Sequence, residues 1–320
     1  MTQPLDFDPA ALERELLGGE RRYTRLEVAQ LTGVSLERCT ELWHALGFAD
    51  VADDVGAFTD RDVWAVRTVN DLGEAGWLAE DMQVSMARAL GQSLSRLSEW
   101  QLAAIGSMLN PTTEPDQAMR RAQELVPVVE ELIGYVWRRH LAAAAGRALA
   151  ASGEEFAAGT TAVGFADMVG FTSLTREIGD EALGALVERF EAVASDIVAT
   201  TGGRVIKTIG DEILFVADDV QTAALIGIRL AEEVPDDALP ELRVGLAYGT
   251  VLSRLGDVYG EPVNLASRMT SIARPGSVLV DREFADALDG DPAWRLRRVP
   301  PRPVRGYALL QPSRLRRASG

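Results

Sequence analysis

Hydrophobic and polar positions follow one period in the first half of the chain and another in the second. Up to about residue 151, apolar residues recur every three or four positions, which predicts amphipathic helices. After about residue 160, short β-rich runs alternate with helical periods, which predicts strands between helices. We therefore expect an all-helical domain over residues 1–152 and an α/β domain over residues 153–320.

The helical half begins with a pattern typical of a helix-turn-helix. Two short amphipathic segments, 26–32 and 36–45, flank a turn that contains glycine. In pattern alone, region 23–72 resembles the winged-helix DNA-binding domain of MerR-type regulators. The segment expected to enter the DNA groove carries Glu37 and Glu41 against a single arginine, a poor complement to phosphate groups. We therefore expect a scaffold for protein contacts and no DNA binding.

Two longer helices are expected over residues 81–109 and 114–151, because Pro111 ends the first of them. Apolar positions in the second helix recur at helical spacing, which indicates a core face or contact with a second subunit. The chain has two histidines, His44 and His140, and both lie in this half. A histidine titrates near neutral pH, so His140 is a candidate pH sensor, although an exposed polar residue is the simpler interpretation.

Composition limits the classes of function. The chain carries 48 acidic and 32 basic residues, and its net charge of −16 disfavours general nucleic-acid binding. Cys39 is the single cysteine, so no intrachain disulfide forms. No apolar run is long enough to span a membrane, and no basic and apolar signal segment precedes Leu5. The expected compartment is the cytoplasm.

Two short strand-like segments each lead to an aspartate. Segment 161–167 is small and apolar and ends at Asp167, while segment 205–216 is a hairpin with Asp211 in its turn. Either aspartate alone is explained as a helix cap or a turn residue. Together, two carboxylates at neighbouring strand ends offer the hard oxygen ligands that Mg²⁺ or Mn²⁺ prefers.

Candidate phosphate and nucleotide contacts lie close to these aspartates. Gly170, Phe171 and Thr172 begin a helix, where backbone N–H groups can approach a phosphate. Lys207 is the chain's one lysine, the remaining basic residues being arginine. A lone lysine among so many arginines suggests a point donor that a planar guanidinium could not replace, although chance would also explain it.

A third motif is a glycine-rich loop that leads into a helix over residues 256–269. Asn264 and Arg268 are four positions apart in it and therefore project from one helix face. A solvated helix flank would explain this pair if the other motifs were absent.

The three motifs together resemble the catalytic domain of class III nucleotidyl cyclases. The sequences that carry the resemblance are FADMVGFTSL, KTIGDEILF and GDVYGEPVNLASRM, in this order and spacing, and it covers about residues 161–310. It implies a ferredoxin-like α/β sandwich, with a mostly antiparallel sheet covered by helices and extended by a C-terminal hairpin. It also implies that Asp167 and Asp211 hold two Mg²⁺ or Mn²⁺ ions, and that Lys207 and Asp257 select the purine.

The resemblance assigns the remaining roles as well. Asn264 would orient the ribose and Arg268 would stabilise the transition state. A C-terminal basic residue would bind the triphosphate; Arg305 is the candidate, with Arg298 and Arg302 as competitors. In the family, the metal carboxylates come from one subunit and the other groups from its partner. The resemblance therefore implies a homodimer and an inactive monomer.

The expected substrate is ATP. Adenine presents an acceptor at N1 and a donor at its amino group, which suit Lys207 and Asp257, whereas guanine presents the reverse pattern. The implied reaction is in-line attack of the ribose 3′-oxygen on the α-phosphorus, giving 3′,5′-cyclic AMP and pyrophosphate. The layout also resembles soluble actinobacterial cyclases in which a helical N-terminal domain regulates the catalytic dimer. The regulatory signal is unknown, with pH or a lipid as hypotheses.

Other interpretations stay open. The GDE turn is similar to the hairpin of diguanylate cyclases, but Ile209 stands where their first glycine would be. A nucleotide-binding sensor without turnover would use the same fold, and a transcription factor with a nucleotide-responsive tail would use both halves. The diguanylate cyclase interpretation gives no reason for the set of Lys207, Asp257, Asn264 and Arg268, and the presence of all six matched residue types argues against a sensor without turnover. The transcription factor would require DNA binding by an acidic segment.

Overall fold

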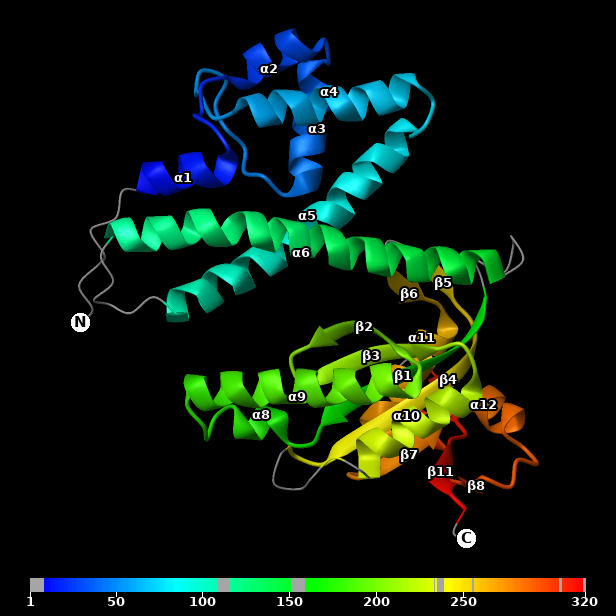
Figure 1. Ribbon diagram of the computed structural model, residues 1–320. Coiled ribbons are helices and arrows are strands. Elements are labelled where there is room, and N and C mark those ends of the chain that lie inside the picture. The colour runs from blue at the N-terminus through cyan, green and yellow to red at the C-terminus, as the bar shows by residue number, and fades with distance from the viewer. Residues whose placement is uncertain are drawn as a thin grey trace. The chain divides into compact units, whose positions relative to one another are not determined.

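The computed structural model describes residues 9–108, 115–150, 159–232, 234, 239–254, 256–304 and 307–318. The chain divides into two compact units, Met1–Ala144 and Ala145–Gly320 (Figure 1). The domain boundary that the sequence predicts after residue 152 falls outside the described residues.

The first unit is helical throughout its described part, apart from one isolated bridge between Tyr23 and Phe58. Its helices are α1 (Pro9–Leu17), α2 (Arg25–Thr32), α3 (Leu36–Leu46), α4 (Asp60–Glu74), α5 (Glu80–Met108) and α6 (Pro115–Ala150), the last of which ends in the second unit.

Local sequence signals explain the helix-turn-helix. Thr24 and Ser35 cap the first turns of α2 and α3, and Gly33 ends α2 with a φ of 73°, a backbone conformation that favours glycine. A small core lies behind the turn, where the rings of Trp43 and Phe58 stack with centroids 4.2 Å apart. In α6, Pro127 lies within the helix without ending it. Among the described residues, no helix is both long and apolar enough to cross a membrane.

The second unit is built on a seven-stranded sheet in the order β2-β3-β1-β4-β7-β11-β8. Its strands are β1 (Thr160–Met168), β2 (Arg204–Ile209), β3 (Glu212–Ala217), β4 (Leu242–Thr250), β7 (Ser277–Val280), β8 (Trp294–Arg298) and β11 (Ser313–Arg317). The pairs β2–β3, β3–β1 and β1–β4 are antiparallel, whereas β4 pairs with β7 in parallel. With the helices between them, they form the expected ferredoxin-like arrangement, so the predicted fold class is confirmed.

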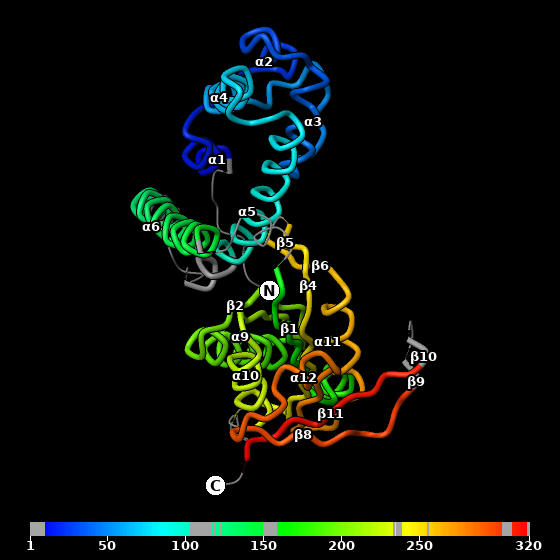
Figure 2. The backbone as a smooth tube through the Cα atoms, turned by 90° about the vertical axis from the view of Figure 1, so that its right-hand side faces the viewer, coloured from blue at the N-terminus to red at the C-terminus, as the bar shows by residue number. Residues whose placement is uncertain are grey.

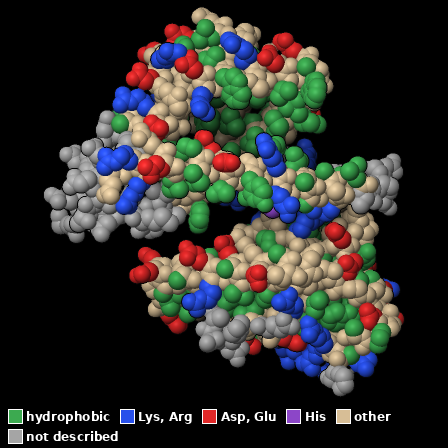
Figure 3. All heavy atoms as spheres, viewed as in Figure 1, with side chains coloured by type: hydrophobic (Ala, Val, Ile, Leu, Met, Phe, Trp, Pro, Cys, Tyr) green, Lys and Arg blue, Asp and Glu red, His purple; other side chains and the backbone are tan. Residues whose placement is uncertain are grey.

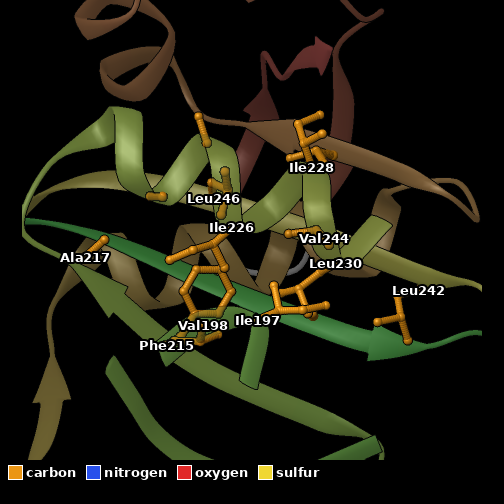
Figure 4. Close-up of a cluster of buried hydrophobic side chains, with 14 of the residues drawn as sticks. Ile197, Val198, Phe215, Ala217, Ile226, Ile228, Leu230, Leu242, Val244 and Leu246 are labelled. Atoms are coloured by element: carbon orange, nitrogen blue, oxygen red, sulfur yellow. The ribbon is translucent and has the colours of Figure 1, made fainter. Parts of the chain in front are cut away.

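One face of the sheet is covered by α9 (Asp180–Thr201) and α10 (Val220–Glu232). Alternate residues of β1, β3 and β4 point to this side and pack against both helices. Figure 4 shows Phe215 of β3 and Leu246 of β4 in this cluster with Ile197 of α9 and Ile226 of α10. This core holds the central strands, and therefore the residues on their other face, in a fixed register.

The opposite face is partly covered by α11 (Glu261–Ile272), which packs over β4 and β1. The approach is close: a Cβ added to Gly245 of β4 would lie 2.2 Å from the backbone nitrogen of Thr270. A short ladder of β5 (Leu252–Arg254) and β6 (Asp257–Tyr259) precedes the helix. We call this side of the sheet the α11 face.

The C-terminal strands extend the sheet beyond β7. β11 pairs with β7 on one side and with β8 on the other, both antiparallel, so β8 forms the edge. β9 (Arg302–Val304) and β10 (Tyr307–Leu310) pair separately, and Figure 2 shows them beyond the far end of β8 and β11. The remaining helices, α8 (Phe171–Leu174) and α12 (Arg282–Ala287), are short.

Candidate active site

Asp167 lies near the end of β1, on the α11 face, and its cross-strand neighbours are Glu212 of β3 and Arg243 of β4. The residue is 8% exposed. Arg243 compensates the buried carboxylate: its Nε donates a hydrogen bond of 2.6 Å to Asp167 Oδ2, and a second guanidinium nitrogen contacts the same oxygen. An ionised carboxylate is costly to bury without such a partner, so Arg243 allows Asp167 to lie here.

Asp211 is brought to the same place by the turn between β2 and β3. Gly210 adopts a φ of 63° in this turn, and the N–H of Met168 donates to the Asp211 carbonyl at 3.0 Å. Burial raises the pKa of Asp167, and the neighbouring Asp211 carboxyl raises it further, against the opposing effect of Arg243. Two neighbouring carboxyl groups are the donor set that a divalent cation would neutralise.

Glu212 is a third acid in this cluster. Burial, and then the charges of Asp167 and Asp211, raise the pKa of Glu212 to about 7, although Arg243 opposes the shift. Among the described residues, no three His, Cys, Asp or Glu side chains form a cluster able to hold a metal by themselves. A cation at Asp167 and Asp211 would therefore take its other ligands from water or substrate phosphates.

Lys207 and Asp257 form the second part of the site. A register shift between Val205 and Lys207 places Lys207 opposite Leu214, which belongs to the core of the α11 face. Lys207 Nζ donates to Asp257 Oδ2 at 2.5 Å, across two segments that are 50 residues apart in sequence. Burial alone would raise the pKa of Asp257, but hydrogen bonds from Lys207 and the Val258 N–H bring it below its usual value.

Asn264 and Arg268 project from α11, as their spacing predicts, with Asn264 exposed and Arg268 half-buried. Within the described part of the chain, no hydrogen bond or ion pair joins either side chain to the aspartate pair. The structure thus brings together Asp167 with Asp211, and Lys207 with Asp257, but does not join these groups to Asn264 and Arg268 within one chain.

The segment after β1 forms a tight turn and a single helical turn. Gly170 has a φ of 76°, and its carbonyl accepts from the N–H groups of Ser173 and Leu174. The N–H groups of Phe171 and Thr172, at the start of this turn, have no backbone partner among the described residues. They keep donors available for an anion near Asp167.

The C-terminal candidates differ in what the structure describes. Arg305 lies outside the described residues, whereas Arg298 ends β8 and Arg302 begins β9. Sequence reasoning missed Glu212 and Arg243. Glu212 directly follows Asp211 in the sequence, so its place beside that motif could have indicated it. Nothing local marks Arg243, because only the pairing of β4 with β1 brings it to Asp167.

Comparison with known proteins places this geometry in a family. Residues 157–311 match the adenylate and guanylate cyclase catalytic domain. A protein of Streptomyces coelicolor named adenylate cyclase is 46% identical over 351 residues, which cover 98% of this chain and 91% of that protein. The chain belongs to the class III nucleotidyl cyclases. It is therefore an enzyme, and the resemblance predicted from the three motifs is confirmed.

This cyclase is also similar to a further named protein and to solved structures. An adenylate cyclase of Streptomyces griseus is 48% identical over 298 residues, covering 89% of this chain and 73% of that protein. Among solved structures, the adenylyl cyclase CyaB from P. aeruginosa is 23% identical with a TM-score of 0.42, and the match covers 50% of this chain and 97% of that chain.

Proposed function

We propose that this cyclase converts ATP to 3′,5′-cyclic AMP and pyrophosphate. The observation that supports ATP as the substrate is the Lys207–Asp257 pair on the α11 face, in which Lys207 Nζ lies 2.5 Å from Asp257 Oδ2. Adenine N1 accepts a hydrogen bond and the adenine amino group donates one, so the ammonium and the carboxylate match both groups. Guanine would place a donor against the ammonium. The names of the two Streptomyces relatives support the same substrate.

The pair is arranged to discriminate by hydrogen bonding. The Lys207 side chain is 36% exposed and that of Asp257 is 25% exposed, so both are partly withdrawn from water while remaining accessible to a base. A buried polar group left without a partner by the wrong base costs more than a missing apolar contact. The low pKa of Asp257 keeps it ionised, and therefore an acceptor, through the physiological range.

Two Mg²⁺ or Mn²⁺ ions would be held by Asp167 and Asp211, whose paired carboxyl oxygens fit hard divalent cations. When bound, such ions lower the pKa of the ribose 3′-hydroxyl and neutralise phosphate charge. Arg243 orients Asp167 from the neighbouring strand, so one carboxylate oxygen is fixed before any cation arrives. The backbone N–H groups of Phe171 and Thr172 would donate to the phosphates beside it.

The active enzyme in this proposal is a homodimer. Asn264 and Arg268 have no contact with the aspartates of their own chain among the described residues, and would act on substrate held by the partner's Asp167 and Asp211. Asn264 orients the ribose, and the Arg268 guanidinium neutralises charge that develops on the α-phosphoryl group. Arg305, or one of its neighbours Arg298 and Arg302, would bind the triphosphate.

The helical unit is proposed to regulate catalysis. It has its own core, and α6 leads from it into the second unit. His140 lies exposed on α6, the helix that leads into the second unit. Both pH and a lipid remain hypotheses for the signal.

The test is cyclic AMP formation by the full-length protein from ATP and from GTP, with Mn²⁺ or Mg²⁺, across acidic to neutral pH. We expect turnover of ATP with little of GTP, and loss of turnover when the cation is chelated. Nucleotide binding without turnover in a confirmed dimer would favour the non-catalytic sensor instead. An unchanged pH profile in the His140→Ala variant would exclude the histidine version of regulation.

A further inference from the structure

The α11 face of the outer strands is lined by arginine. Cross-strand register places Arg314 of β11 opposite Arg297 of β8, and Arg316 opposite Arg295. Alternation along both strands sends these four side chains to one face, while Leu296 and the other intervening residues pack against the core on the opposite face. Like charges directly opposite each other destabilise a sheet, so this arrangement opposes folding when nothing lies between them.

The acids that the structure describes do not neutralise these arginines. Among the described residues, no ion pair joins an aspartate or glutamate to any of seven arginines, which are Arg274, Arg295, Arg297, Arg298, Arg302, Arg314 and Arg316. Elsewhere in the chain, arginines do pair, as Arg282 does with Asp286. Acids outnumber basic residues by 48 to 32 in the sequence, yet no described acid forms an ion pair with these arginines.

These side chains surround a hollow. A cavity of about 260 Å³ is bounded by apolar Ile272, Leu279, Val299 and Pro300 and by five of the arginines, which are Arg274, Arg297, Arg298, Arg302 and Arg314. A second cavity, of about 360 Å³, shares Arg297 and Arg314 with the first and adds Arg295 and Arg316. Figure 3 shows basic side chains gathered at the end of the molecule where Figure 1 places β8 and β11.

Arg314 lies where the two cavities meet, and one of its donors is unused. Its Nε is buried and has no hydrogen-bond partner. Burial and the charges of Arg316 and Arg274 lower the pKa of the Arg314 guanidinium, against the opposing effect of Glu232. A buried donor without a partner is costly, and an anion in the cavity would satisfy it.

We propose that this cavity is a binding site for a small anion with several phosphate groups, of the pyrophosphate and tripolyphosphate class. Planar guanidinium groups bind phosphate oxygens in bidentate fashion, and several of them around one hollow favour several phosphates over one. Among the described residues that line the two cavities none is aromatic, so these side chains offer nothing on which a nucleobase would stack. A concave site also suits a small anion better than a flat membrane surface.

The site is separate from the proposed catalytic one. None of Lys207, Asp257, Asn264 and Arg268 lines either cavity. Of the C-terminal arginines considered for the substrate triphosphate, Arg298 and Arg302 line the first cavity, whereas Arg305 lies outside the described residues. β4 and β7 lie between β1 and β11, and neighbouring strands are about 4.8 Å apart, so β11 lies about 14 Å from the strand that carries Asp167. Helix α11 packs over the intervening β4. Arg298 and Arg302 are thereby assigned to a second anion site and Arg305 to the substrate triphosphate, whichever nucleotide is cyclised.

The test uses the full-length protein, with tripolyphosphate and pyrophosphate as probes and sulfate at equal ionic strength as the reference. The variant R297Q/R314Q removes the two arginines shared by both cavities, and R121Q/R282Q removes two exposed arginines elsewhere with the same change in charge. Binding is measured by calorimetry, and the thermal midpoint of each protein is measured with and without the anion.

We expect tripolyphosphate to bind R297Q/R314Q at least tenfold more weakly than the parent protein, and R121Q/R282Q within about twofold of it. Without anion, R297Q/R314Q should melt at a higher temperature, because a repulsive pair has been removed, and tripolyphosphate should no longer raise its midpoint. The exposed pair R295Q/R316Q should show a smaller loss of binding.

Three results would overturn the proposal. The first is unchanged binding in R297Q/R314Q, or a fall in its midpoint without anion. The second is an equal loss of binding in Arg268→Gln, which would place the anion in the catalytic site. The third is binding to vesicles rich in phosphatidylglycerol, lost in R297Q/R314Q, with no binding of the free anions, which would make the surface a membrane contact.

Discussion

Arg243 and Asp167 lie opposite each other on neighbouring antiparallel strands, and the guanidinium of Arg243 donates to the carboxylate of Asp167. The acid side chain is 12% exposed, so water compensates little of its charge. This ion pair lets a carboxylate stay inside the sheet face before any cation is bound.

Removal of Arg243 should therefore destabilise the protein. We expect Arg243→Gln to lower the free energy of unfolding by about 1–3 kcal/mol at neutral pH, because the Asp167 carboxylate loses its partner. The loss should shrink as the pH falls, since a protonated Asp167 needs no counter-charge. Urea unfolding at several pH values measures this, with D167N/R243Q as the control that recovers part of the loss. Equal destabilisation at every pH would contradict the argument.

The Lys207–Asp257 pair should control base choice. Asp257→Ala removes the acceptor for the adenine amino group, so we expect the ratio of kcat/KM for ATP over GTP to fall by at least tenfold. The Mn²⁺ concentration for half-maximal activity should change little, because Asp257 does not contact Asp167 or Asp211. A parallel loss of metal affinity and base selection would show that Asp257 has another role.

Complementation would test the shared active site. Asp167→Ala and Arg268→Ala should each be nearly inactive alone. After mixing and exchange of subunits, about a quarter of the parental activity should return, because half the dimers are mixed and one site in each is intact. The control is a mixture of Asp167→Ala with Asp211→Ala, whose mixed dimers have no intact site. Recovery in that control, or none in the first mixture, would contradict the two-chain site.

Asp281 should make stability depend on pH. This residue caps α12 and is 3% exposed, and burial raises the pKa of its carboxyl to about 7. The folded state therefore holds a proton that the unfolded state releases near pH 4, so stability falls as the pH rises from about 4 to about 7, by at most about 1.4 kcal/mol per pH unit.

The matched variant for this effect is Asp281→Asn. Asparagine keeps the acceptor that caps Phe284 but does not titrate. We expect its unfolding free energy to vary less between pH 4 and pH 7 than that of the parent, as measured by urea unfolding. The same dependence in both proteins would assign the effect to other groups.

Close packing of α11 on β4 should make Gly245 intolerant of any side chain. A Cβ at this position would lie 2.3 Å from the Ala266 carbonyl and 2.2 Å from the Thr270 nitrogen, and both are backbone atoms. We expect Gly245→Ala to lower the free energy of unfolding by about 1–3 kcal/mol, and to lower activity because α11 carries Asn264 and Arg268.

Gly184 provides the control for that substitution. It lies in α9 with nothing within 4 Å of an added Cβ, so Gly184→Ala should be neutral or stabilising by about 0.5–1 kcal/mol. Thermal unfolding of both variants measures the difference. Similar thermal midpoints for Gly245→Ala and Gly184→Ala would mean that α11 shifts to admit the added methyl group without loss of stability.

Local patterns in the sequence predicted the division into a helical and an α/β half, the helix-turn-helix with its glycine, and the places of Asp167 and Asp211 at a strand end and a turn. These features depend on local periodicity, capping and turn chemistry, which neighbouring residues encode. The family also followed from the sequence, because its motifs are short and contiguous.

Contacts between residues far apart in the sequence depend instead on how the strands pair. Arg243 reaches Asp167 because β4 pairs with β1, and the opposed arginines of β8 and β11 depend on the register of two strands far from the motifs. The contact of Lys207 with Asp257 likewise spans 50 residues. A one-residue shift in register would send each side chain to the other face, and no local pattern fixes that pairing.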